Sequence, residues 1–290
     1  MVAPVVDLGL LASLPSAAGE LFKLNSALTS WGCFQAINHG MSSSFLSKVR
    51  ELMKQFFTLP MEEKQKYASP ADDMEGYGSD MVLSEQQVLD WNERLPLIVS
   101  LEDEGKLNIW PQKPESFRDT VQEYSVKLQA IVDVVLKAIA LSLNLEENCF
   151  LDQVGERGKM YTRLNYYARC PRPDLVYSLK PHADGSTLTI VLPDEEVQGL
   201  QFLKVDQWIS VSTIPEAVLI NTRYNGALCR VVTNTTSDRI SVAVFCCPEE
   251  EKEIGPADGL INEETPRLYK KIFYSDYYQL GKRPIEALKI

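Results

Sequence analysis

Near residue 155 the spacing of apolar residues changes from a helical to a strand-like period. The strongest helical pattern runs from 116 to 143. Beyond 155, short β-rich runs alternate with turn residues, at 161–167, 187–192, 200–203, 208–211, 217–221, 230–233 and 239–246. Such spacing is typical of an antiparallel sandwich or barrel. We therefore expect a mainly β core with flanking helices.

The first 155 residues predict helices separated by short strands. Strands are expected at 4–8 and 34–37, and a helix is expected where apolar residues recur at Phe45, Val49, Leu52 and Phe56. We divide the chain into an N-terminal helical region (1–155), a β core (156–255) and a short helical tail (256–290). A chain of 290 residues can pack these parts into one compact unit, and we expect a monomer.

Charge and apolar patterning exclude several classes of partner. Lysine and arginine number 29 against 40 acidic residues, for a net charge of −11, with no basic run to attract phosphate. Nucleic acid and membrane are therefore not expected as partners. The apolar stretch 131–143 is interrupted by Asp133 and Lys137, so no spanning helix is predicted. The N-terminus does not resemble a signal peptide, and the six cysteines form no CxxC pair. We expect free thiols and a cytoplasmic location.

His182 and Asp184 are the first candidates for chemistry. Side chains at i and i+2 on a strand project to one side, where an imidazole and a carboxylate can share a metal. With a further histidine, this set forms the triad that suits iron(II) and leaves open coordination positions. Alone, a His–x–Asp pair is more often a surface pair than a ligand set. The chain has only one other histidine, His39.

Two further groups offer polar side chains at the same i, i+2 spacing. Arg239 and Ser241 can receive a small dicarboxylate, because a guanidinium binds a carboxylate through two parallel hydrogen bonds. Asn165 and Tyr167 share a face and can bind an anionic ligand. A rim ion pair for Arg239, and a buried tyrosine with a polar partner for Tyr167, are the alternative interpretations.

The residues of these motifs, and their order along the chain, resemble those of the plant 2-oxoglutarate- and iron(II)-dependent dioxygenases, especially the alkaloid O-demethylases and flavonoid oxygenases. The resemblance covers essentially the whole chain. The matching stretches include 31–35, 37–40, 56–60, 75–78, 89–91, 163–167, 197–201, 230–234, 239–241 and 281–284. It implies a double-stranded β-helix (jelly-roll) core flanked by helices. It also implies an oxidoreductase that uses Fe(II), 2-oxoglutarate and molecular oxygen, with ascorbate as a possible addition, on a hydrophobic small metabolite.

The resemblance also implies roles for the candidate residues. His182 and Asp184 would be iron ligands. Arg239 and Ser241 would hold the distal carboxylate of 2-oxoglutarate, and Asn165 and Tyr167 would help to place its metal-proximal end. The expected reaction is hydroxylation, O-demethylation or desaturation.

Cys229 departs from the family pattern, in which a histidine opens this stretch as the third iron ligand. The segment from Asn221 to Cys229 is also shorter than in the family, as is the helix expected between Tyr277 and Gly281. Loss of a strand would expose unpaired backbone edges. Two explanations compete: the chain is a relative with impaired iron binding, which we favour, or the Cys229 thiolate replaces the imidazole. A non-catalytic or non-oxidative ligand-binding descendant is the alternative to an oxygenase.

Overall fold

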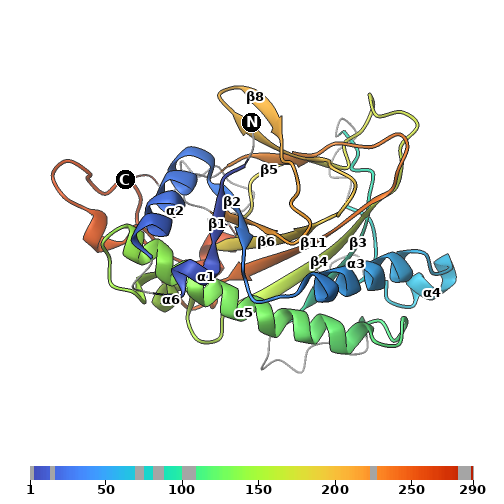
Figure 1. The fold of residues 1–290 in the computed structure, drawn as a ribbon, viewed down its shortest axis with the longest axis horizontal. Helices are drawn as coiled ribbons and strands as arrows, with labels where there is room; N and C mark the ends of the chain where they lie inside the picture. Colours follow the sequence, from blue (N-terminus) through green and yellow to red (C-terminus); the bar gives the residue numbers. More distant parts are fainter. Residues whose placement is uncertain are drawn as a thin grey trace.

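Two facing β-sheets and a layer of helices make up the computed structural model, which describes residues 3–13, 17–68, 75–80, 88–99, 109–222, 227–279 and 289. The larger sheet has seven strands in the order β1-β2-β9-β6-β11-β4-β3, and the smaller has four in the order β5-β10-β7-β8. Figure 1 shows α5 and α3 below the larger sheet, with β5 and β8 above it. The stretch after Asn221, which we expect to be shorter than in the family, includes residues 223–226, which lie outside the described residues. The whole of 281–284 also lies outside them.

The strands follow the chain in this order: β1 Val5–Asp7, β2 Cys33–Ile37, β3 Glu93–Ile98, β4 Lys159–Tyr167, β5 Leu179–His182, β6 Leu188–Pro193, β7 Leu200–Lys204, β8 Gln207–Ser210, β9 Val218–Thr222, β10 Cys229–Val231, β11 Arg239–Cys247, β12 Glu253–Ile254 and β13 Ile272–Phe273. The α-helices are α1 Leu8–Leu11, α2 Ala18–Trp31, α3 Ser43–Phe57, α4 Met61–Gln65, α5 Phe117–Ser142, α6 Cys149–Val154 and α7 Tyr274–Gln279, and a 3₁₀ turn, η3, spans Asp258–Leu260.

Helix α5 forms the floor of the core, as its apolar spacing predicts. Its buried stripe includes Leu128, Val135 and Ile139, which join the main apolar cluster beneath the larger sheet. Burying one such side chain stabilises the fold by about 1.5–3 kcal/mol. The helix at 45–56 is also confirmed, as α3, where the Ser42 hydroxyl accepts the Phe45 N–H and caps the first turn.

Strand β11 shows how the larger sheet separates its two faces. Ile240, Val242 and Val244 are buried in the apolar cluster that contains α5. Because side chains alternate along a strand, Arg239 and Ser241 project to the opposite face, toward the smaller sheet. The fold therefore places polar side chains between the two sheets and apolar ones against the helices.

Strand β3 was not predicted, although all seven β-rich runs after residue 155 are strands. It carries Pro96, which lacks a backbone donor, and it is the last strand in the order of the sheet, where proline is tolerated. Strands β1, β2 and β3 extend the larger sheet with segments from before residue 155. The C-terminal part holds the expected short helix, α7, and also a small β12–β13 sheet.

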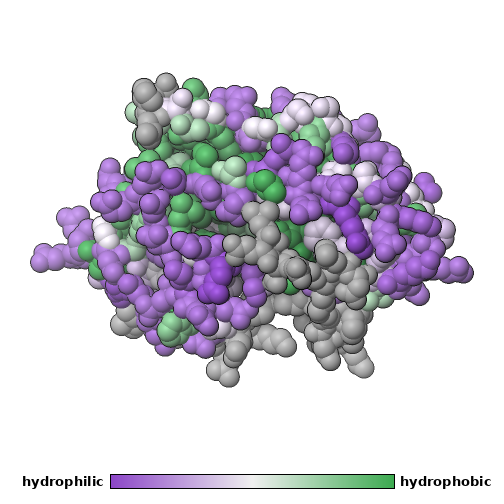
Figure 2. Space-filling model, turned by 90° about the horizontal axis from the view of Figure 1, so that it is seen from below, coloured by the Kyte–Doolittle hydropathy of each residue, from purple (hydrophilic) through white to green (hydrophobic). Residues whose placement is uncertain are grey.

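The face below the helices is mostly hydrophilic, with scattered apolar side chains (Figure 2). No helix in the described ranges is long and apolar enough to cross a bilayer. All six cysteines lie within the described residues, and none of them forms a disulfide.

Candidate active site

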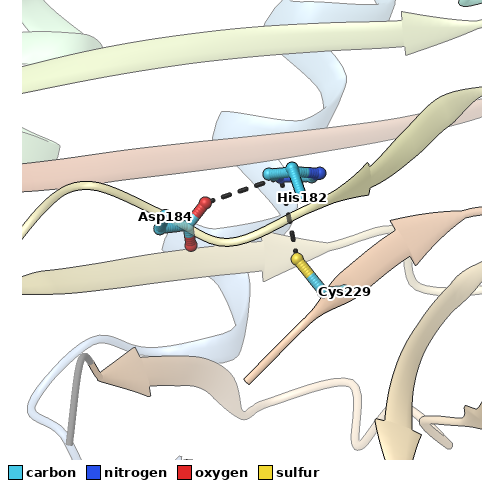
Figure 3. A group of neighbouring side chains, drawn as sticks. All are labelled: His182, Asp184 and Cys229. Atoms are coloured by element: carbon cyan, nitrogen blue, oxygen red, sulfur yellow. Dashed lines mark hydrogen bonds and ion pairs between the residues drawn. The ribbon is translucent and has the colours of Figure 1, made fainter. Parts of the chain in front are cut away.

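Three side chains with metal-ligand chemistry converge between the two sheets. Nε2 of His182 lies 3.5 Å from Oδ1 of Asp184 and 3.6 Å from Sγ of Cys229. All three ligand atoms lie within 4.8 Å of one another. Figure 3 shows dashed lines that join the imidazole to both the carboxylate and the thiol. The structure therefore brings Cys229 to the pair that the His–x–Asp motif suggested.

Strand pairing explains this convergence. Strands β5 and β10 are antiparallel neighbours, and Cys229 is the register partner of His182. Asp184 lies two residues beyond the His182 position, just past the end of β5. A register irregularity between Cys229 and Val231 marks the start of β10.

Two outer contacts orient the ligand atoms. Nδ1 of His182 lies 2.8 Å from the Lys180 carbonyl. In the neutral imidazole that a metal requires, a proton on Nδ1 donated to that carbonyl would leave the Nε2 lone pair facing Asp184 and Cys229. Nδ2 of Asn221, on β9, donates to Oδ2 of Asp184 at 2.8 Å. Nothing in the sequence marks Asn221, a polar residue in the otherwise mostly apolar strand β9, as the partner of Asp184.

The electrostatics of the site favour a positive charge at its centre. Burial lowers the pKa of His182, but hydrogen bonds to Asp184 and Cys229 outweigh it and raise the pKa to about 11. Burial raises the pKa of the Asp184 carboxyl. The hydrogen bond and charge of His182 lower that pKa and contribute to a net shift that is downward. Without a metal, an imidazolium supplies the charge that the carboxylate and thiol stabilise.

The donor set fits a single divalent metal. Bonds of about 2.0–2.3 Å to nitrogen, oxygen and sulfur ligands place neighbouring donors roughly 3–4.5 Å apart. The two measured separations from His182 fall within that range. An imidazole, a carboxylate and a thiolate are all known ligands of iron, although a thiolate adds a negative charge that a second imidazole would not.

A second polar group lines the same face of the larger sheet. Arg239 pairs in register with Tyr167, and Ser241 pairs with Asn165. All four residues are buried. The guanidinium of Arg239 lies 5.1 Å from the centre of the Tyr167 ring. The Asn165 amide nitrogen lies 3.5 Å from the Ser241 hydroxyl. The register therefore brings together all four residues that the motifs singled out.

Arg239 is buried and has unpaired donors that an anion could satisfy. It is only 3% exposed, which excludes the rim ion pair considered as an alternative. Its Nε and Nη1 atoms make no hydrogen bond to any described residue. A buried guanidinium with unpaired donors is costly unless a ligand satisfies them. Gly199 lies against it, and a Cβ there would be 3.2 Å from Cδ of Arg239, so a larger residue would crowd the guanidinium.

His39 does not contribute to this site. Its Nε2 lies 2.8 Å from the Glu216 carbonyl, and its Nδ1 accepts the Met41 N–H at 3.2 Å. The group of candidate metal ligands among the described residues thus contains one histidine, His182.

Comparison with known proteins identifies the family. Residues 3–113 match the model of the non-haem dioxygenase N-terminal region in morphine synthesis, and 158–248 match the 2OG-Fe(II) oxygenase superfamily. The chain is 38% identical to codeine O-demethylase of Papaver somniferum, covering 94% of this chain and 79% of that protein. It is 34% identical to flavonol synthase 1 of Crocosmia x crocosmiiflora, covering 97% and 87%.

A solved structure agrees with these matches. The crystal structure of JOX2 in complex with 2OG, Fe and JA superposes with a TM-score of 0.89 at 30% identity, covering 97% of this chain and 85% of that one. The jelly-roll core expected from the sequence is therefore confirmed. The relatives are 2-oxoglutarate- and iron(II)-dependent oxygenases that act on small metabolites. This chain belongs to the 2OG-Fe(II) oxygenase superfamily, as one of its plant-type members.

Proposed function

We propose that His182, Asp184 and Cys229 form the iron(II) site of this chain, with Cys229 in the place that the family resemblance assigns to a histidine. The observation that carries this proposal is the convergence of three donor atoms within 4.8 Å. Together with 2-oxoglutarate, iron(II) supplies the capacity to oxidise a substrate C–H bond with molecular oxygen.

Arg239 and Ser241 would bind the distal carboxylate of 2-oxoglutarate, and Asn165 and Tyr167 would place its metal-proximal end. The unpaired, buried donors of Arg239 support this assignment, because a carboxylate satisfies two guanidinium donors at once. The Ser241 hydroxyl projects from the same face of β11, two residues along the strand.

The substrate class follows from the relatives rather than from the site. Proteins named as O-demethylases and a flavonol synthase support a small hydrophobic or aromatic metabolite. Its hydroxylation, O-demethylation or desaturation would be the reaction. The protein would act as a cytoplasmic monomer, organised as regions 1–155, 156–255 and 256–290.

Cys229 makes impaired iron retention the expected state of the wild-type protein. A thiolate adds a negative charge beside Asp184 and is open to oxidation, whereas a neutral imidazole is not. The same residue supports a second candidate function, a ligand-binding descendant that has lost oxidation chemistry.

Iron stoichiometry and 2-oxoglutarate turnover, measured on the same protein, separate these functions. Purified protein would be loaded with Fe(II) under argon, desalted and assayed for bound iron, and succinate release would then be followed in air. Weak iron retention with slow succinate release supports an impaired oxygenase. Binding of 2-oxoglutarate without succinate supports the ligand-binding descendant. The variant Asp184→Ala, which removes a proposed ligand, serves as the metal-free control.

A further inference from the structure

Asp80 lies at the outer end of a chain of polar contacts that reaches the proposed cosubstrate residues. It belongs to the described segment 75–80, which joins β3 through reciprocal backbone hydrogen bonds between Gly78 and Arg94, at 2.9 and 2.7 Å. Oδ2 of Asp80 accepts hydrogen bonds from Nη2 of Arg163 at 2.6 Å and from Nδ2 of Asn92 at 3.0 Å. Oδ1 lies 3.0 Å from Nε of Arg94. One carboxylate thus holds two guanidinium groups.

Arg163 contacts both Asp80 and Asn165 and so links them. The two residues are two positions apart on β4, so their side chains share a face. Nε of Arg163 donates to Oδ1 of Asn165 at 2.7 Å. The amide oxygen of Asn165 is therefore engaged, and its Nδ2 faces the Arg163 carbonyl at 3.1 Å and the Ser241 hydroxyl at 3.5 Å. The orientation of this amide depends on where Arg163 is held.

The strand register places the residues between Asp80 and the cosubstrate pocket side by side. Asn165 is the register partner of Ser241 on β11 and of Arg94 on β3. The three residues form one row across the sheet, on the face that carries Arg239. The side chains of Asp80, Arg94 and Arg163 are 15%, 18% and 21% exposed, whereas Asn165 and Ser241 are 2% and 4% exposed. The contacts thus run from the partly exposed rim to the buried pocket.

The two guanidinium groups need the carboxylate between them. Arg94 and Arg163 approach closely enough that the charge of Arg163, after the larger effect of burial, lowers the pKa of Arg94. Without the negative charge of Asp80, their repulsion would favour movement of Arg163 toward solvent. Its Nε would then leave Oδ1 of Asn165, and the amide would be free to rotate.

We propose that Asp80 is a positioning residue that sets the affinity for 2-oxoglutarate by holding Arg163 against the amide of Asn165. The inference rests on the proposed role of Asn165 and Ser241 in binding the cosubstrate. The hydrogen bonds and ion pairs of Asp80 go to Asn92, Arg94 and Arg163, so its effect on 2-oxoglutarate passes through Arg163.

A double-mutant cycle tests this coupling. The dissociation constant for 2-oxoglutarate would be measured by calorimetry under argon, with excess Fe(II), for the wild type, Asp80→Asn, Asn165→Ala and the double variant. Loss of one charge-assisted contact should weaken binding by about fivefold to tenfold in Asp80→Asn. The double variant should bind no more weakly than Asn165→Ala, because Asp80 acts through Asn165. Fully additive losses would overturn the proposal.

Glu20→Gln is the matched control. Glu20 is a buried carboxylate on α2 that accepts the Asp7 N–H at 2.8 Å and pairs with Lys23 at 2.9 Å. Its substitution should lower the melting temperature and leave the 2-oxoglutarate affinity unchanged. An equal loss of affinity in Glu20→Gln would show that Asp80→Asn acts through general stability, and the proposal would fail.

Crystal structures of the wild type and Asp80→Asn, solved without metal or cosubstrate, compare the positions of the Arg163 and Asn165 side chains directly. Displacement of the Arg163 guanidinium and rotation of the Asn165 amide are expected. Unchanged side chains would overturn the inference. If Asn165 moves while the wild type binds no 2-oxoglutarate, the proposed cosubstrate site fails and the structural coupling from Asp80 to Asn165 stands.

Discussion

Sγ of Cys229 lies 3.6 Å from Nε2 of His182, across two antiparallel strands that pair these residues directly in register. A sulfur more than about 6 Å from the His182–Asp184 pair could not have joined them on one metal, given metal–thiolate bonds of about 2.3 Å. The side chain at position 229 therefore faces the proposed metal site, although the segment before it is expected to be shorter than in the family.

Replacing Cys229 by histidine should raise iron affinity and 2-oxoglutarate decarboxylation together. A neutral imidazole completes the donor set without a second negative charge beside Asp184, and an affinity gain of at least about tenfold is expected. Fe(II) titration and succinate assays on both proteins measure it. Cys170→Ser, at a buried cysteine outside the cluster, controls for loss of a thiol. A wild type that already holds one tight iron and turns over at about 1 per second or faster would contradict the proposed impairment.

Arg239→Lys should weaken 2-oxoglutarate binding by about tenfold or more, because an ammonium cannot reproduce the two parallel hydrogen bonds of a guanidinium. Calorimetric titration measures the dissociation constant. The control is Arg230→Lys, at an arginine whose guanidinium lies 4.2 Å from the centre of the Trp208 ring and donates to Gln201. It should leave the affinity unchanged. Equal affinity of the wild type and Arg239→Lys would remove Arg239 from the cosubstrate site.

Asn221→Ala should weaken metal binding, by about tenfold, without removing any proposed ligand. The Asn221 amide fixes the Asp184 carboxylate, and loss of such outer contacts typically costs 10–100-fold in affinity. Titration with Co(II), followed by its absorption spectrum, reports both affinity and ligand geometry. Asn25→Ala, which removes an amide hydrogen bond from α2 to the Ser142 carbonyl, is the control. Unaltered Co(II) affinity and spectrum in Asn221→Ala would count against this orienting role.

The stabilising effect of Asp80 should depend on pH. Burial raises the pKa of its carboxyl, but the charge and hydrogen bond of Arg163, with help from Asn92 and Arg94, lower it below the usual value of 3.8. Because the folded-state pKa is the lower one, the contribution is fully present above the unfolded-state pKa and is lost as the pH falls through the folded value. Urea unfolding of the wild type and Asp80→Asn should therefore show a constant difference from pH 5 to 7 that shrinks below about pH 4. A difference independent of pH would contradict the ion-pair origin.

Strand β3 shows where sequence patterns were insufficient. Its Pro96 and its charged residues are typical of a loop, and the segment is a strand because it pairs with β4. Patterns served better where one face is apolar and continuous, as on α5 and along β11, because alternation or helical spacing records burial directly.

The sequence by itself determined the fold class, the candidate residues and which of them share a face, because side-chain direction follows from the period of a helix or strand. Tertiary structure alone decided which strands became neighbours and in what register. That register placed Cys229 opposite His182, brought Asn221 to Asp184, and joined Asp80 to Arg163 across 83 positions of the chain. Contacts between distant segments depend on how sheets pack and pair, which local periodicity does not encode.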